Sequence, residues 1–172
     1  MKKTTRQLKD ISLLCSVEKK QIADWNRTAV DSYPLDKSLP DLFEAQVEKT
    51  PGAAALIFKD QTLTYQALNE QANQLAHSLQ EAGIGLEQRV AVYMERSLEM
   101  VIALLAIVKA GAAYVPIDPS YPEDRIQYML EDADVSVVLK DIPETSDQPS
   151  HNPKRTLHPQ SSAYVIYTSG ST

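Results

Sequence analysis

The residues best suited to chemistry form the stretch TSGST at 168–172, directly after the alternating, aromatic-rich stretch AYVIY at 163–167. Period-two alternation predicts a strand at 163–167. Glycine lets the backbone approach a ligand closely, successive N–H groups can surround an anion, and hydroxyls add donors for phosphate oxygens. We therefore expect a phosphate-binding loop whose contacts come from Thr168, Ser169, Gly170, Ser171 and Thr172.

Taken alone, this loop is a weak signal, because clusters of Ser, Thr and Gly more often form plain turns. It lacks the Gly-Lys-Ser of a P-loop, and no glycines in the chain have the spacing of a dinucleotide-binding fingerprint. The formal net charge of -6 means that local donors, rather than overall charge, would have to hold an anionic ligand. The significance of the loop therefore depends on the elements that position it.

Alternating strand and helix signals lead up to the loop. Helical periodicity with capping residues predicts helices at 65–82, 98–110 and 123–132. Short apolar runs between turn residues predict strands at 53–58, 62–63, 89–94, 113–117 and 135–139. This order is typical of an α/β fold with a mostly parallel sheet and flanking helices. The parallel sheet is expected to contain the strands near Ala53, Val90, Tyr114, Val135 and Tyr164.

Two more helices are expected before this alternation begins. Ser16 is the expected N-cap of a helix that reaches Trp25, and Ser38 with Asp41 three residues later has the spacing of a capping box. Between 141 and 162, four prolines stand among polar residues, which predicts an exposed loop.

Composition narrows the class of protein. Of the 172 residues, 43% are hydrophobic and 23% charged, as in an ordinary globular domain, and the net negative charge disfavours a nucleic-acid partner. The longest apolar stretch, at 100–108, is shorter than the roughly 20 residues that span a bilayer, and the N-terminus has no apolar signal core, so we expect a cytoplasmic protein with no membrane partner. A single cysteine, Cys15, fits a reduced compartment and receives no role. The three histidines, His77, His151 and His158, are expected to be surface residues rather than metal ligands.

Three stretches together resemble a known family. LTYQAL at 63–68, VKAGAAYVPIDPSYP at 108–122 and AYVIYTSGST at 163–172 are similar, in order and spacing, to core motifs of the adenylation domains of nonribosomal peptide synthetases, which belong to the adenylate-forming or AMP-binding enzymes. Ala67 departs from the first motif, where Glu is usual. Residues 13–34 resemble the connection between a condensation domain and its adenylation domain. Within the motifs, we expect Tyr65, Lys109, Tyr114 and Asp118 to serve the scaffold rather than to contact ligand.

The resemblance implies a domain plan: 1–37 as the connection that follows a condensation domain, and 38–172 as the N-terminal portion of the large subdomain of an adenylation domain. The family's third motif continues beyond the point that Thr172 occupies, and its catalytic lysine lies later still, so no residue here is assigned as catalytic. On this interpretation the chain is incomplete, and the isolated 172 residues are expected to be inactive.

The resemblance also implies an activity, in secondary-metabolite biosynthesis. ATP, with Mg²⁺, activates an amino acid as an aminoacyl-adenylate, which then passes to phosphopantetheine on a downstream carrier domain. Two alternatives stay open. The chain could be a catalytically inert interaction piece that docks through the helix at 17–25, with Trp25 as anchor, or part of a ligase that joins a fatty or aryl acid to CoA. The resemblance at 13–34 argues against the ligase.

Overall fold

The structure, a computed structural model, describes residues 14–28, 34–155 and 157–168. Contacts divide the chain into two compact units, Met1–Pro34 and Leu35–Thr172. None of the helices in the described residues is long and apolar enough to cross a bilayer. The interpretation of residues 1–37 as an interdomain connection stays a prediction.

The first unit contains helix α1 (Ser16–Trp25), none of whose ten residues is buried. The expectation that Ser16 caps this helix is wrong, because Ser16 is its first helical residue and Cys15 is the N-cap. The Glu18 carboxylate accepts a hydrogen bond from the Cys15 backbone N–H at 2.7 Å. A glutamate three residues after the N-cap thus satisfies a backbone donor that the helix leaves free.

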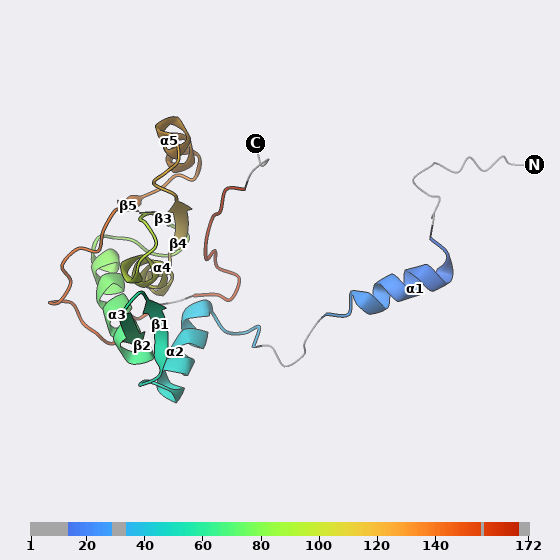
Figure 1. Cartoon of the computed structure of the whole chain (residues 1–172), viewed down its shortest axis with the longest axis horizontal. Coiled ribbons are helices and arrows are strands. Elements are labelled where there is room, and N and C mark those ends of the chain that lie inside the picture. The colour runs from blue at the N-terminus through green and yellow to red at the C-terminus, as the bar shows by residue number, and fades with distance from the viewer. Residues whose placement is uncertain (1–13, 29–33, 156, 169–172) are drawn as a thin grey trace, which may run out of the picture. The chain divides into compact units, whose positions relative to one another are not determined.

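The second unit contains the predicted alternation of helices and strands (Figure 1). Its elements are α2 (Leu39–Lys49), β1 (Ala54–Phe58), β2 (Gln61–Thr64), α3 (Tyr65–Glu81), β3 (Arg89–Tyr93), α4 (Leu98–Ala110), β4 (Ala113–Ile117), α5 (Glu123–Asp132) and β5 (Val137–Leu139). Helices α2, α3 and α4 are capped by Ser38, Thr64 and Ser97, whose side chains each accept a hydrogen bond from the backbone N–H three residues later. The capping signals in the sequence therefore located these helix starts correctly.

A three-stranded parallel sheet in the order β4-β3-β5 is the centre of this unit. Val90 of β3 lies opposite Tyr114 on one side and Val137 on the other. Val90 and Val92 belong to the apolar cluster built with α3 and α4, whereas Ala91 between them belongs to the cluster built with α5. The sheet is therefore covered on both faces, by α3 and α4 on one side and by α5 on the other (Figure 1).

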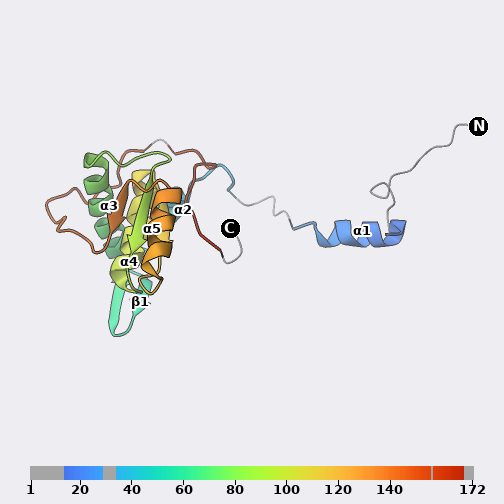
Figure 2. The ribbon, with the colours of Figure 1, turned by 90° about the horizontal axis from the view of Figure 1, so that it is seen from above.

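The expectation that the strand near Ala53 joins the parallel sheet is wrong. β1 pairs antiparallel with β2 in a separate two-stranded sheet, as Figure 2 shows for the hairpin that extends from the helical body. Phe58 lies opposite Gln61, so only Lys59 and Asp60 connect the strands. Such a short connection can only return the chain antiparallel, because a parallel pair needs a long crossover. The pairing of β1 is therefore determined by its short connection to β2 more than by its apolar sequence.

The 163–167 segment reaches the parallel sheet but does not form the full predicted strand. Tyr164 makes a single parallel bridge to Tyr114 of β4, whose carbonyl accepts the N–H of Val165 at 2.9 Å. In a parallel ladder the next donor on that side of β4 would be residue 116, which is a proline and has no N–H. Pro116 therefore limits the pairing along this edge.

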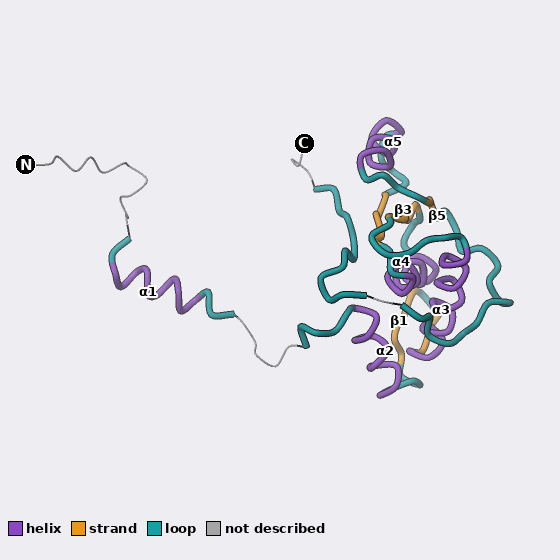
Figure 3. Tube along the Cα trace, turned by 180° about the vertical axis from the view of Figure 1, so that it is seen from behind, coloured by secondary structure: helices purple, strands orange, loops and turns teal. Residues whose placement is uncertain are grey.

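The loop that follows β5 runs along α3, as the tube in Figure 3 shows. Asn73 of α3 is fully buried and donates a hydrogen bond to the backbone carbonyl of Ser150 at 2.7 Å. Thr145 is only 8% exposed. His151 and His158 are exposed, as expected for this loop. The loop as a whole is not fully exposed, because Thr145 is buried and Ser150 is hydrogen-bonded to α3.

Candidate functional site

The carboxyl ends of β3 and β4 open onto a hollow of about 610 Å³. In parallel α/β sheets, ligands bind in the crevice outside the carboxyl ends of the strands. The residues that line this hollow from the loops after the strands and from the segment beside β4 include Met94, Arg96, Asp118, Tyr121, Ile166 and Tyr167. The fold thus places a ligand-sized hollow where parallel sheets commonly bind ligands.

The chain enters the predicted phosphate-binding loop beside this hollow. Ile166 and Tyr167 line the hollow, and exposed Thr168 follows them directly. The other four predicted site residues, Ser169, Gly170, Ser171 and Thr172, lie outside the described residues. Phosphate contact by all five therefore stays a prediction, for which the position of residues 166–168 supplies the structural context.

In the part of the chain that the structure describes, three charged side chains line the hollow: Glu95, Arg96 and Asp118. Asp118 accepts a hydrogen bond from the backbone N–H of Ser120 at 2.8 Å, and this bond, with the charge of Arg96 nearby, lowers the pKa of its carboxyl. Arg96 is the one arginine or lysine among the described residues that line the hollow. Sequence reasoning missed Arg96, although its place two residues after the end of a predicted strand was a usable signal.

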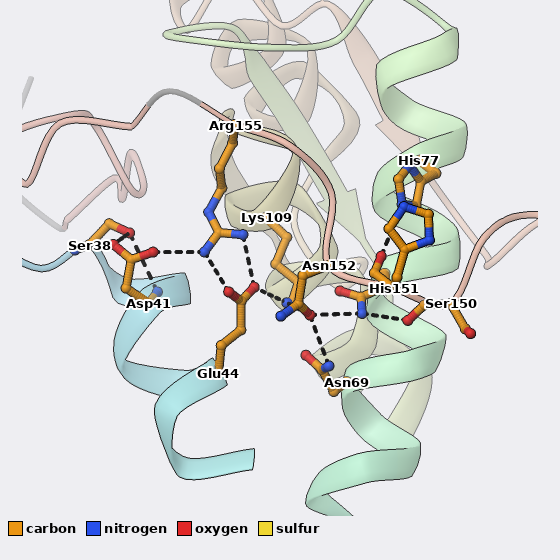
Figure 4. Close-up of polar contacts among 11 residues, drawn as sticks. Ser38, Asp41, Glu44, Asn69, His77, Lys109, Ser150, His151, Asn152 and Arg155 are labelled. Carbon is orange, nitrogen blue, oxygen red and sulfur yellow. Dashed lines mark hydrogen bonds and ion pairs between the residues drawn. The ribbon is translucent and has the colours of Figure 1, made fainter. Parts of the chain in front are cut away.

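Lys109, although it lies in the second motif, does not line the hollow but belongs to a partly buried polar cluster (Figure 4). Its fully buried ammonium forms an ion pair with Glu44 of α2 and lies 3.3 Å from the side-chain oxygen of Asn152. Arg155 donates to both carboxylate oxygens of Glu44 and to Asp41, each at 2.8 Å. Burial lowers the pKa of Lys109, and the hydrogen bond from Lys109 to Glu44 opposes that shift. These contacts are those of a scaffold residue, and the expectation that Lys109 does not contact ligand stays a prediction.

The segment between Arg155 and Thr168 is held to the rest of the unit at several points, of which Arg155 in this cluster is the first. After Arg155, the backbone N–H and hydroxyl of Ser162 donate to the Glu87 carboxylate at 3.0 and 2.7 Å. Tyr164 then bridges to Tyr114, with ring centroids 5.7 Å apart. The half-buried Tyr114 therefore supports the segment beside the sheet, as expected of a scaffold residue.

Comparison with known proteins shows which family the sequence matches. The profile of the AMP-binding enzyme family matches residues 43–154. Tyrocidine synthase 3 of Brevibacillus parabrevis is 47% identical over 188 residues, which cover 96% of this chain and 3% of that protein. Bacitracin synthase 3 of Bacillus licheniformis is 44% identical over 184 residues, which cover 97% of this chain and 3% of that protein. The chain thus spans only a small part of the length of these relatives.

Solved structures agree with the sequence comparison. The AMPPNP-bound form of the nonribosomal peptide synthetase FmoA3 has a TM-score of 0.76 and 30% identity, over 88% of this chain and 18% of that chain. The N-terminal subdomain of Klebsiella oxytoca NpsA, in complex with 3-hydroxyanthranilyl-AMSN, has a TM-score of 0.71 and 33% identity, over 78% and 38% of the two chains. The α/β arrangement is that of these subdomains.

Proposed function

Because the chain belongs to the AMP-binding enzyme family, we propose that it supplies the phosphate-binding loop of an enzyme that activates an amino acid with ATP. In this reaction the substrate carboxylate attacks the α-phosphate, a new carboxyl–phosphate bond forms, and pyrophosphate leaves. The aminoacyl group would then pass to a phosphopantetheine thiol on a carrier domain, as part of nonribosomal peptide synthesis in the cytoplasm.

The observation that best supports this proposal is that Ile166 and Tyr167, which directly precede Thr168, line the hollow at the carboxyl ends of β3 and β4. A nucleotide in this hollow would have its phosphates next to the hydroxyl of Thr168 and to the residues that follow it. Hydroxyl and backbone N–H donors suit phosphate oxygens, so the residue types fit the ligand. Arg96 supplies a positive charge at the same mouth.

Mg²⁺ usually binds through one or two carboxylates together with substrate phosphates, and it would offset the charge that ATP brings. Asp118 lines the hollow and, like any exposed aspartate, is ionised at neutral pH, so it is available there as an acceptor. The residues of this chain would then act on ATP mainly by holding and orienting its phosphates.

The relatives named as tyrocidine and bacitracin synthases favour an amino acid as the second substrate. An aryl acid is the second candidate, because the NpsA subdomain was solved with a 3-hydroxyanthranilyl compound. The two candidates can be distinguished by which acid, an amino acid or an aryl acid, stimulates the exchange of pyrophosphate into ATP.

The test uses a chimera in which residues 35–172 replace the matching residues of Tyrocidine synthase 3. We expect this chimera to exchange labelled pyrophosphate into ATP when an amino acid is present. Exchange with an aryl acid alone would favour the second candidate. A folded chimera that shows no exchange with any of the common amino acids or aryl acids would contradict the proposal, provided that the parent synthase is active in parallel.

A further inference from the structure

Tyr167, the residue directly before Thr168, is held by two side chains of α5. Its hydroxyl donates a hydrogen bond to the Asp132 carboxylate at 2.5 Å. Its ring meets that of Tyr128 edge to face, with centroids 6.3 Å apart. Tyr128 and Asp132 are four residues apart and so lie on one side of the helix, one turn from each other. Residues one turn apart on α5 therefore contact both the ring and the hydroxyl of Tyr167.

Helix α5 is a firm support for these contacts. Met129 is 2% exposed and Ala133, directly after the helix, is 5% exposed. Both pack in the apolar cluster that covers the sheet, and Tyr167 itself packs against that cluster. The core therefore holds the helix that carries the exposed Asp132, and the hydrogen bond ties the side chain of Tyr167 to that helix.

The hydrogen bond from Tyr167 to Asp132 follows the point at which the backbone pairing with β4 ends. The pairing with β4 extends to the N–H of Val165, and Pro116 offers no donor for the next step of the ladder. Two residues later the hydroxyl of Tyr167 supplies a bond to α5 instead. The segment beside the sheet is thus anchored first through its backbone and then through Tyr167.

We propose that Tyr167 is a positioning residue, whose hydrogen bond to Asp132 fixes the chain at the entrance of the phosphate-binding loop. The inference rests on the proposed function, since it assigns Tyr167 the task of holding Thr168 beside the hollow. Burial, together with the bond to Asp132, raises the pKa of Tyr167 to about 12. A tyrosine hydroxyl is protonated at neutral pH in any case, and the raised pKa keeps it a donor to higher pH.

Anchoring is tested first on the 172-residue chain, by hydrogen–deuterium exchange and without any need for activity. Tyr167→Phe keeps the ring and its contact with Tyr128 but removes the donor. We expect the amides at 165–168 to exchange several-fold faster in this variant, with β3 and β5 unchanged. Tyr164→Phe, in a side chain that is 55% exposed, is the matched control and should leave these amides as in the parent. Unchanged exchange at 165–168 in Tyr167→Phe would overturn the anchoring.

The consequence for the reaction is tested in the chimera. The bond between Tyr167 and Asp132 is solvent-exposed, so Tyr167→Phe should raise the KM for ATP by about two- to fivefold. The KM for the amino acid should stay within twofold. Asp132→Ala should behave like Tyr167→Phe, and Asp132→Asn, whose amide oxygen can still accept, should recover most of the loss. The double variant Tyr167→Phe with Asp132→Ala should be no worse than either single variant.

These outcomes separate the two proposals. An equal rise in both KM values, or additive losses in the double variant, would mean that Tyr167 acts only through general stability and would overturn the positioning role. A chimera that lacks exchange before any substitution contradicts the proposed function, and the amide exchange of the 172-residue chain then still decides whether Tyr167 anchors the segment.

Discussion

Thr168 is the one predicted phosphate contact within the described residues, and its hydroxyl can be tested by itself. In the chimera, Thr168→Val keeps the size of the side chain and removes the donor. Loss of one preorganised donor to a developing charge should cost about 2–4 kcal/mol in the transition state, which is on the order of a 30- to 1,000-fold loss of pyrophosphate exchange. Thr62→Val, at an exposed position of β2, is the control. Parent rates in Thr168→Val would refute its contact with phosphate.

Lys109 shows how a conspicuous residue in a motif can serve the scaffold. Its fully buried ammonium pairs with Glu44, so Lys109→Met leaves the half-buried Glu44 carboxylate with Arg155 as its remaining ion-pair partner among the described residues. Breaking a buried pair by removing one member usually costs about 3–5 kcal/mol, and the remaining partner puts the expected loss near the lower value. Urea unfolding of the 172-residue chain measures it. Lys154→Met, on the exposed surface of the same loop, should change the free energy of unfolding by less than about 0.5 kcal/mol.

Helix α4 ends at Gly111, whose φ of 98° lies in the left-handed region. A Cβ at this position would meet its nearest atom at 3.6 Å, an ordinary contact, so backbone strain is the main cost of Gly111→Ala. We expect about 1–2 kcal/mol of destabilisation. Gly52→Ala adds a Cβ with nothing within 4 Å and without a left-handed φ, so it should be nearly neutral. Equal stabilities of the two variants in urea would contradict this explanation of the helix end.

The start of α2 should make stability depend on acid pH. Burial alone would raise the pKa of Asp41, but hydrogen bonds from Ser38 and Arg155 outweigh burial and lower it below its usual value of 3.8. A lowered pKa in the folded state contributes stability above pH 3.8 that is lost as the pH falls through the folded pKa. Asp41→Asn should therefore lose less stability than the parent between pH 5 and pH 3. Parallel losses in the two proteins, measured by urea unfolding, would show that Asp41 does not contribute.

The sequence predicted local elements well and long-range partners less well. Helix starts at Ser38, Thr64 and Ser97 follow from capping chemistry within a few residues, so one sequence contains enough information. The place of β1 depended on the length of its turn, and the short pairing at Tyr164 depended on a proline in another strand. The hydrogen bond between Tyr167 and Asp132 joins residues that are 35 positions apart, and no local sequence pattern predicts that they pair.

At the scale of the whole molecule, we expect the purified 172-residue chain to show no amino-acid-dependent pyrophosphate exchange. Adenylation needs the carboxylate and the α-phosphate held in line, with positive charge where the transition state becomes more negative. The described residues place one cation, Arg96, at the hollow, and the chain carries a net charge of -6. We also expect no rise in Tm with ATP. Clear exchange by a homogeneous preparation of the chain would overturn this expectation.

The central claim is that residues 168–172 hold the phosphates of ATP beside the hollow at the carboxyl edge of the parallel sheet. A crystal structure of the chimera with AMPPNP tests it most directly. We predict phosphate oxygens within hydrogen-bond distance of the Thr168 hydroxyl or of the backbone N–H groups that follow it, next to the hollow bounded by Ile166 and Tyr167. A nucleotide bound with its phosphates elsewhere, and with no contact to residues 168–172, would contradict the claim.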